Sequence, residues 1–320
     1  MEAIRVEKHG GPEVLVPAQV PTPAPGPGQV LVKLAATGVN YIEIYQRTGL
    51  YQVPMPLTPG AEGAGTVVAV GEGVTTPAVG DRVASTNFAG AYAEFALAPA
   101  DRTVPVPDGV SDDVAAAALL QGMTAHYLLF DSYPVKSGDA VLVHAAAGGM
   151  GLLLTQLATR LGARVIGTVS TSEKEKLARQ AGAAEVIGYD DVAAQVRELT
   201  GGAGVAAVYD GVGKSTFDGS LASLRMRGTL VLYGQASGPV PPMDPQRLQA
   251  AGSAFLTRPT LQHHIVTRDE LLRRAGDVYG WVADGSLSVR IGGRYPLAEA
   301  RRAQEDLAAR RTTGKLLLMP

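Results

Sequence analysis

The clearest indication of the fold is Val141-Leu142-Val143-His144-Ala145-Ala146-Ala147-Gly148-Gly149-Met150-Gly151, an apolar run followed by small residues. A strand, a glycine-rich turn and a helix in this order form the G-x-G-x-x-G turn that binds dinucleotides, here with Ala146 at the first glycine position. A glycine at 148 would let backbone N–H groups approach a pyrophosphate, which the positive end of the helix dipole attracts. Gly151 would let the helix lie close to the strand. The alternative is a strand–helix turn that binds no ligand.

Strands and helices alternate around this turn, from residue 139 to about residue 256. The apolar patterns predict strands at 140–144, 164–168, 185–187, 205–209 and 229–233. They predict helices at 149–161, 173–181, 192–200 and 216–224. Because the joints are short and rich in glycine, we expect an α/β fold with a doubly wound parallel sheet, the Rossmann arrangement.

The sequence outside this region has a different pattern, rich in short strands. Before residue 111 the pattern predicts strands at 29–34, 65–70, 81–84 and 91–96, with glycine and proline between them, as in a barrel-like domain. A helix is expected at 111–120, and the last part predicts a helix at 269–284, a strand at 287–290 and a helix at 297–309. We therefore expect a Rossmann domain, residues 123–256, inserted in a discontinuous β-rich domain, residues 1–122 and 257–320.

The composition excludes several classes of protein. Lysine and arginine number 28 against 30 aspartates and glutamates, a net charge of −2, which argues against nucleic acid as a partner. The absence of cysteine excludes disulfides, thiolate catalysis, cysteine zinc sites and iron–sulfur clusters. No apolar run reaches the roughly 20 residues that span a bilayer, and the N-terminal residues are charged. We expect a cytoplasmic protein with no membrane partner.

The end of the second strand of the alternating region indicates which coenzyme is preferred. NAD-selective sites carry an acidic residue about 20 residues beyond the glycine turn, and it accepts hydrogen bonds from the ribose 2′-hydroxyl. Here Thr168 and Ser170 stand at the strand end, with Lys174 on the following helix. Hydroxyls and an ammonium suit a 2′-phosphate, so NADPH is predicted as the cofactor. Alternatively, Ser172 only caps that helix and Lys174 is solvated; the neighbouring Glu173 also weighs against a phosphate.

Motifs along nearly the whole chain resemble those of the zinc-independent quinone oxidoreductases. This group of the medium-chain dehydrogenase/reductase superfamily includes zeta-crystallin. The matching segments are residues 38–42, 47–51, 59–65, 121–125, 144–151, 209–213 and 257–259. The resemblance implies a partly open, GroES-like barrel domain around the Rossmann domain, with NADPH as reductant and a quinone or related electron-poor acceptor as substrate.

The resemblance also bears on metal binding. Asn40 and Ala61 stand where zinc-dependent relatives have a cysteine and a histidine as zinc ligands, and neither is an ordinary zinc ligand. The five histidines show no metal-ligand spacing, so no metal is expected. Without a Lewis acid to stabilise an alkoxide, electron-poor acceptors are better suited to the site than alcohols.

The site residues are predicted from the glycine turn, the strand end and the resemblance. By resemblance, Asn40 and Tyr45 lie near the nicotinamide and its phosphates, Thr124 near the nicotinamide amide, and Tyr189 near the adenosine 2′-phosphate. The glycine turn and the strand end add Ala147, Gly148, Gly149, Met150, Gly151, Thr168, Ser170 and Lys174 as predicted cofactor contacts. The resemblance implies the further contacts Gly211, Tyr233, Gly234, Thr257, Arg258 and Lys315. Asn40 and Tyr51 are the candidate catalytic residues. Tyr51 would orient or protonate the acceptor, and solvent is an equally good proton source.

The predicted function is NADPH-dependent reduction of a quinone, by hydride or by single electrons in sequence. One alternative is a zinc-free reductase of enones or enoyl thioesters on the same fold. Another is an RNA-binding or structural, crystallin-type role, which the net charge does not favour. The resemblance also implies a homodimer, formed through an edge strand near residues 253–256, since exposed edge strands are natural pairing surfaces.

Overall fold

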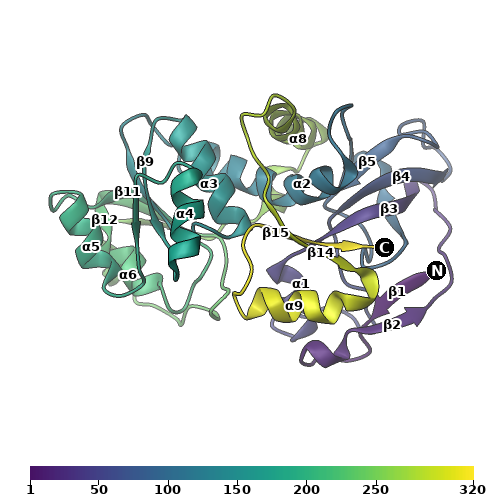
Figure 1. Cartoon of the computed structure of the whole chain (residues 1–320), viewed down its shortest axis with the longest axis horizontal. Helices are drawn as coiled ribbons and strands as arrows, with labels where there is room; N and C mark the ends of the chain where they lie inside the picture. The colour runs from purple at the N-terminus through teal and green to yellow at the C-terminus, as the bar shows by residue number, and fades with distance from the viewer. The chain divides into compact units, whose positions relative to one another are not determined.

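A computed structural model describes all 320 residues, which form two compact units (Figure 1). Unit 1 comprises Met1–Met123 and Ile265–Pro320, and unit 2 comprises Thr124–His264. The domain boundaries expected from the sequence, 1–122 with 257–320 and 123–256, stay a prediction.

Unit 2 is built on a six-stranded parallel sheet, as expected for a Rossmann fold. Its strands lie in the order β10-β9-β8-β11-β12-β13. Their bounds are β8 Ala140–Val143, β9 Arg164–Thr168, β10 Glu185–Ile187, β11 Val205–Asp210, β12 Leu224–Leu232 and β13 Phe255–Thr257. The strand order reverses between β8 and β11. In open parallel sheets, ligands bind at the carboxyl ends of the strands at such a reversal.

Helices connect these strands and bury the apolar core of unit 2. They are α3 Gly149–Arg160, α4 Ser172–Gln180, α5 Val192–Leu199, α6 Phe217–Ala222 and α7 Gln246–Ala250, with short helical turns at Leu128–Ser132 and Leu261–His264. Right-handed crossovers place such helices on both faces of the sheet. Strand residues such as Leu142, Ile166 and Val208 are therefore fully buried, which explains their continuous apolar runs.

Unit 1 contains the predicted β-rich, GroES-like domain. Six of its strands follow the order β14-β15-β3-β4-β5-β7, β6 pairs with β3, and β1 and β2 form a separate antiparallel pair. The strands are β1 Glu2–Arg5, β2 Val16–Gln19, β3 Gln29–Val39, β4 Gly63–Val70, β5 Arg82–Ser85, β6 Phe95–Pro99, β7 Thr103–Pro105, β14 Ile291–Pro296 and β15 Lys315–Met319. The helices are α1 Tyr41–Arg47, α8 Arg268–Ala283 and α9 Ala300–Ala308, with α2 Asp112–Tyr127 and short turns at Pro12–Val14, Ala100–Arg102 and Leu297–Glu299.

Several elements differ from the sequence-based expectation. The strand predicted at 287–290 was wrong, because the strand starts at Ile291, where pairing with β15 begins. β15 itself was not predicted, and it lies between β14 and β3. The predicted strand at 91–96 lies at Phe95–Pro99, and α2 runs to Tyr127 rather than ending near residue 120. Pairing between segments that are distant in sequence determines where these strands begin and end, and local sequence patterns do not predict this pairing.

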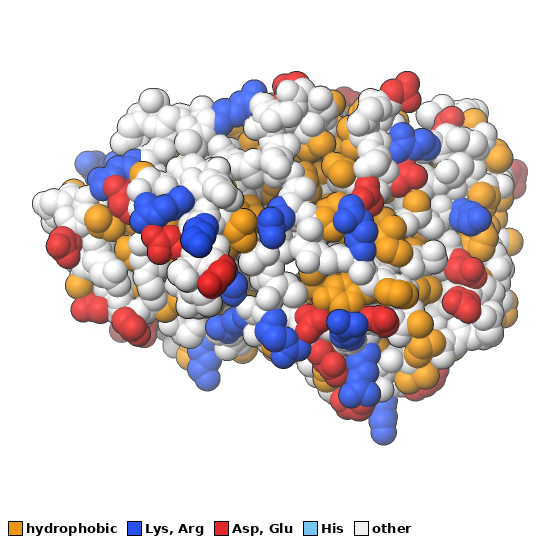
Figure 2. Space-filling view, in the orientation of Figure 1, with side chains coloured by type: hydrophobic (Ala, Val, Ile, Leu, Met, Phe, Trp, Pro, Cys, Tyr) orange, Lys and Arg blue, Asp and Glu red, His pale blue; other side chains and the backbone are white.

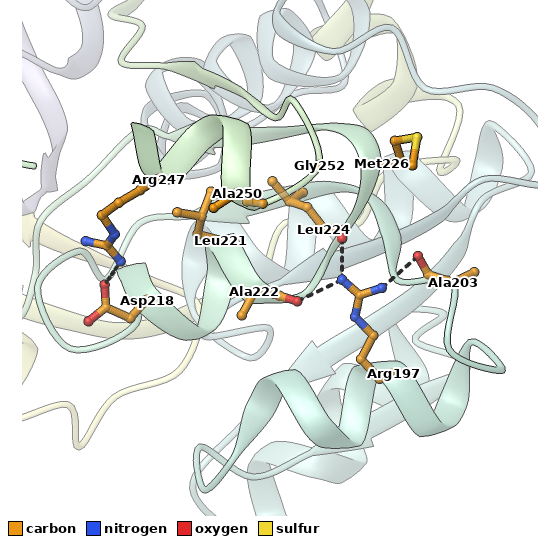
Figure 3. A pocket seen from close by; sticks show the side chains of 11 residues that line it. Arg197, Ala203, Asp218, Leu221, Ala222, Leu224, Met226, Arg247, Ala250 and Gly252 are labelled. Atoms are coloured by element: carbon orange, nitrogen blue, oxygen red, sulfur yellow. Dashed lines mark hydrogen bonds and ion pairs between the residues drawn. The ribbon is translucent and has the colours of Figure 1, made fainter. Parts of the chain in front are cut away.

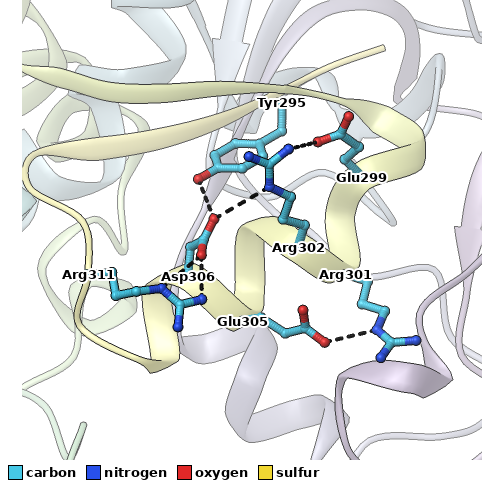
Figure 4. A network of polar contacts seen from close by, with 7 residues as sticks. All are labelled: Tyr295, Glu299, Arg301, Arg302, Glu305, Asp306 and Arg311. Atoms are coloured by element: carbon cyan, nitrogen blue, oxygen red, sulfur yellow. Dashed lines mark hydrogen bonds and ion pairs between the residues drawn. The ribbon is translucent and has the colours of Figure 1, made fainter.

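Acidic and basic side chains are interspersed over the face shown in Figure 2. In unit 1 some of them form a network between β14 and α9 (Figure 4). Asp306 accepts hydrogen bonds from Arg311, at 2.6 Å, and from the Tyr295 hydroxyl, at 2.9 Å. The Arg311 guanidinium, followed by the Tyr295 hydroxyl, lowers the pKa of Asp306. Exposed ion pairs of this kind stabilise a fold only weakly.

None of the helices combines the length and the apolar character that crossing a membrane requires.

Candidate functional site

The predicted dinucleotide turn joins β8 to α3 in unit 2. Gly148 is the N-cap of α3, with extended backbone angles, and no side chain caps the helix. The N–H groups of residues 149–151 thus have no acceptor from an N-cap side chain. The exposed Ala145 takes a left-handed conformation, with φ 51°, and its carbonyl accepts a hydrogen bond from the Gly148 N–H at 2.8 Å. A helix N-terminus with bare N–H groups is suited to an anion.

The two glycines at positions 148 and 151 of this turn have different roles. A Cβ on Gly151 would overlap the Ala145 carbonyl oxygen and lie 2.6 Å from the Ala146 Cα, so this position must be glycine for α3 to approach the turn. A Cβ on Gly148 would meet only the Ala145 oxygen, at 3.2 Å, with no other atom within 4 Å. Gly148 therefore leaves open space beside the helix N-terminus, the space that a diphosphate requires.

The neighbouring strand ends bring further predicted residues to the turn. The hydroxyls of Thr168 and Tyr189 both accept from the Ala145 N–H, each at 3.1 Å. Thr168 is fully buried beneath the turn, whereas Tyr189 is 39% exposed. The Thr168 hydroxyl therefore supports the turn, and a direct contact of Thr168 with the cofactor stays a prediction.

Ser170 and Lys174 flank the start of α4. Ser170 is exposed and Lys174 is half-buried. The N-cap of α4 is Thr171, whose hydroxyl accepts from the Lys174 N–H at 3.3 Å, so the alternative in which Ser172 caps this helix was wrong. Hydroxyls and an ammonium at this strand end fit a phosphate group.

The ends of β11, β12 and β13 hold the remaining predicted residues of unit 2 except Thr124. A Cβ on Gly211 would lie 2.8 Å from the Tyr233 ring, and one on Gly234 would lie 2.5 Å from the Gly211 oxygen. The glycine at 211 thus makes room for the Tyr233 ring. Arg258 follows β13 and donates to the Leu232 carbonyl at 3.1 Å.

Two more predicted residues of unit 2 lie on regular elements. Thr124 is a partly exposed residue of α2, and Thr257 is the last residue of β13. Their contacts with a cofactor stay a prediction.

In unit 1, Asn40 belongs to a buried polar cluster that we call the Asn40 cluster: Asn40, Glu43, Glu62 and Lys315. The Lys315 ammonium donates to Asn40 Oδ1 at 2.6 Å and to Glu62 Oε2 at 2.5 Å. Asn40 Nδ2 donates to Glu62 Oε2 at 3.0 Å, and the Asn40 N–H donates to Glu43 Oε2 at 2.7 Å. All four side chains are at most 7% exposed.

This arrangement gives Lys315 a structural role, and its predicted cofactor contact stays a prediction. The Lys315 side chain is 1% exposed, and its ammonium binds a carboxylate and an amide within unit 1. The Lys315 ammonium fixes the orientation of the Asn40 amide, because Asn40 Oδ1 must face this ammonium and Asn40 Nδ2 must face Glu62. Glu43 and the Lys315–Glu62 pairing were not predicted. Asn40 and Glu43 form a capping box at the start of α1, a local signal that could have indicated Glu43. Glu62 and Lys315 come from distant segments and form no local motif with Asn40.

Glu43 is the one acid of the Asn40 cluster with no direct cationic partner. Burial raises its pKa to about 8 despite the opposing effect of the Lys315 charge. The folded protein thus keeps this proton between the ordinary pKa of 4.5 and about 8, whereas the unfolded chain releases it. Stability from this group is therefore lost as the pH rises through that window.

We expect Glu43→Gln to remove this pH dependence, because the amide stays neutral and its oxygen can still accept from the Asn40 N–H. In urea unfolding, the wild type should lose roughly 1 kcal/mol per pH unit through this group between about pH 5 and about pH 8. The variant should show a correspondingly flatter profile. Parallel profiles for the two proteins would contradict a protonated Glu43.

Aromatic side chains stand beside the Asn40 cluster in sequence, on α1 and the loop after it. The rings of Tyr41 and Tyr45 are 6.1 Å apart, and those of Tyr45 and Tyr51 are 5.3 Å apart. Tyr51 is 37% exposed, and its N–H donates to the Tyr45 carbonyl at 3.0 Å. Exposed aromatic faces offer a stacking surface for a flat, conjugated molecule.

A pocket of about 650 Å³ lies elsewhere in unit 2 and contains none of the predicted site residues (Figure 3). Its arginines are already engaged. Arg197 donates to four carbonyls, including that of Leu224 at 2.7 Å, and Arg247 pairs with Asp218 at 2.5 Å. These bonds tie α5, α6 and α7 to β12, so we assign this pocket no part in the candidate site.

Among all 320 residues, no group of three or more histidine, aspartate or glutamate side chains is placed to hold a metal ion.

The chain is similar to several known proteins. The family model "Alcohol dehydrogenase GroES-like domain" matches residues 26–108, and "Zinc-binding dehydrogenase" matches residues 149–275. A quinone oxidoreductase of Pseudomonas aeruginosa is 46% identical over 99% of both chains. A 2-haloacrylate reductase of Burkholderia is 42% identical over 98% of both. A mycobacterial structure in complex with NADPH matches all of both chains with 57% identity and a TM-score of 0.98.

Proposed function

Because the chain belongs to the quinone oxidoreductase family of the medium-chain dehydrogenase/reductase superfamily, we propose that it reduces a quinone with NADPH. In this reaction NADPH, a proton and a quinone give NADP⁺ and a hydroquinone. The observation that carries the proposal is the open, uncapped N-terminus of α3 at Gly148, at the reversal of a parallel sheet.

The residues of unit 2 fit a phosphorylated dinucleotide. The N–H groups at the start of α3 would bind the diphosphate, and Ser170, Lys174 and Tyr189 would bind the 2′-phosphate. When bound, NADPH supplies the hydride. The tight Gly151 turn holds α3 against the sheet, and binding in one fixed orientation replaces a chance encounter of the reactants.

Unit 1 supplies the residues proposed to act on the acceptor. Asn40 offers an amide whose orientation is set by Lys315 and Glu62. Tyr45 and Tyr51 offer aromatic faces against which a quinone ring can pack. Tyr51 is our candidate for orienting or protonating the acceptor oxygen, with solvent as the other proton source.

An acceptor panel tests the proposal. Purified protein with NADPH and several small quinones should consume NADPH, and NADH should be the poorer donor. If no quinone is reduced although NADPH binds, quinone reduction is wrong. The similarity to a 2-haloacrylate reductase favours one second candidate, reduction of an activated double bond. Faster NADPH consumption with a 2-haloacrylate or an α,β-unsaturated ketone than with any quinone would select it.

Coenzyme preference provides a further prediction. Lys174→Ala should raise the KM for NADPH about tenfold and leave that for NADH unchanged, because only NADPH carries the 2′-phosphate that the ammonium binds. Lys176→Ala is the matched control: Lys176 is an exposed lysine of the same helix, and its removal should change neither value. If the two substitutions raised the KM for NADPH equally, Lys174 would act only through its charge and not through a direct contact with the 2′-phosphate.

We also propose a homodimer and a cytoplasmic location. β13 lies at the edge of its sheet, and Phe255 on this strand is 61% exposed. Edge strands of this kind can pair across a two-fold axis. Sedimentation of the wild type should give a dimer, and a species of one chain at micromolar concentration would contradict it.

A further inference from the structure

We propose that His144 is a positioning residue for NADPH binding, which acts through a buried chain of hydrogen bonds on the backbone of the dinucleotide turn. This inference rests on the proposed function and adds a residue to it. His144 directly follows β8, one of the two strands between which the strand order reverses. The dinucleotide turn begins at the next residue, Ala145.

The hydrogen-bond chain runs through unit 2 from the turn to Asp210. Thr168 Oγ1 accepts from the Ala145 N–H at 3.1 Å and lies 3.0 Å from His144 Nδ1. His144 Nε2 lies 2.9 Å from Ser220 Oγ, and Ser220 Oγ donates to Asp210 Oδ2 at 2.7 Å. The four side chains are at most 1% exposed, so water does not replace these partners.

The partners determine the direction of every bond. Ser220 gives its only proton to the Asp210 carboxylate, so its oxygen accepts from His144 Nε2–H. Burial lowers the pKa of His144, which keeps the imidazole neutral, with one donor and one acceptor. Nδ1 is then the acceptor and receives the Thr168 proton. The Thr168 oxygen is left to accept from Ala145. The Thr168 and Ser220 hydroxyls therefore each donate one hydrogen bond in this series, and His144 is the neutral tautomer with its proton on Nε2.

The far end of the chain is itself firmly held. Asp210 also accepts from the N–H groups of Val212 and Gly213, at 2.8 and 2.9 Å, and from the Thr216 hydroxyl. These bonds fix the segment after β11, the other strand at the sheet reversal. The chain thus connects the ends of β8, β9 and β11 with defined polarity.

The near end of the chain acts on a strained residue. Ala145 has φ 51°, a conformation that costs an alanine roughly 1 kcal/mol, and its N–H is held by Thr168 and Tyr189. The Ala145 carbonyl in turn accepts from the Gly148 N–H, the N-cap of α3. Loss of His144 frees the Thr168 hydroxyl to rotate, and the turn that presents the α3 N–H groups loses its support.

Measured NADPH binding by four variants tests the inference. His144→Leu removes both hydrogen bonds, and His144→Gln replaces them with an amide oxygen that accepts and an amide N–H that donates. Ser220→Ala breaks the chain further on. Ser223→Ala is its matched control, because Ser223 is equally buried on the same helix end and donates only to the Gly219 carbonyl. Thermal unfolding checks that each variant is folded.

We expect His144→Leu to weaken NADPH binding about tenfold, and Ser220→Ala to weaken it severalfold. The KM for NADPH should rise while kcat changes little, since the turn binds but does not react. His144→Gln should remain within about threefold of the wild type, and Ser223→Ala should match it.

Two results would overturn the inference. One is a folded His144→Leu that binds NADPH as the wild type does. The other is a His144→Gln that loses as much affinity as His144→Leu, which would show that shape rather than hydrogen bonding matters. Failure of the wild type to bind NADPH would instead contradict the proposed function itself.

Discussion

Gly148→Leu is expected to reduce NADPH affinity at least 100-fold, equivalent to about 3 kcal/mol. The leucine side chain would occupy the open space beside the uncapped N-terminus of α3, where Gly148 leaves no atom but one carbonyl oxygen within 4 Å. A diphosphate could then no longer reach the N–H groups of the first turn. Fluorescence titration with NADPH measures the change.

The matched control for this substitution is Gly276→Leu. Gly276 lies within α8 of unit 1, and a Cβ there meets no atom within 4 Å. The Gly276→Leu variant should bind NADPH with the same affinity as the wild type. Because a Cβ on Gly148 would also contact only one atom, the Ala145 oxygen, the unfolding temperature of Gly148→Leu should be close to that of the wild type. Tight NADPH binding by a folded Gly148→Leu would contradict the assigned turn.

Lys315→Met is expected to destabilise the protein by about 3–5 kcal/mol. It removes the ammonium that pairs with Glu62 at 2.5 Å, in surroundings where the two side chains are 1% and 0% exposed. The Glu62 carboxylate would remain buried with no opposite charge, and the Asn40 amide would lose the donor that orients it. Urea unfolding at neutral pH measures the loss.

The double variant Glu62→Gln with Lys315→Met separates the lost ion pair from lost packing. It removes both charges and keeps an oxygen at position 62 to accept from the Leu120 N–H, which now donates to Glu62 at 2.7 Å. We expect it to recover most of the stability lost in the single variant. A double variant as unstable as Lys315→Met alone would show that the charge pairing contributes little.

The dinucleotide turn could be predicted because its determinants are adjacent in sequence. The apolar strand, Gly148, Gly151 and the start of α3 lie within a dozen residues, and each has a local physical role. The parallel strands of unit 2 were predicted for the same reason, since their apolar runs and glycine joints are local signals. The resemblance to known quinone oxidoreductases added the family to this reading.

The contacts of Asn40 with Glu62 and Lys315 could not be predicted because sheet pairing brings these three residues together. Asn40 and Lys315 are 275 residues apart in the chain, and they meet because β15 pairs with β3. One signal was present at Gly38, where a Cβ would lie 2.8 Å from the Glu62 carboxyl carbon and 2.9 Å from the Lys315 Cε. That glycine makes room for the ion pair, but the sequence does not say for which residues.

The most direct test of the dinucleotide site is a crystal structure of this protein with NADPH bound. It should show diphosphate oxygens about 3 Å from the N–H groups at the start of α3, beside Gly148, with the 2′-phosphate near Ser170 and Lys174. A coenzyme bound with its diphosphate away from α3, and the Gly148 turn facing only solvent, would contradict the account.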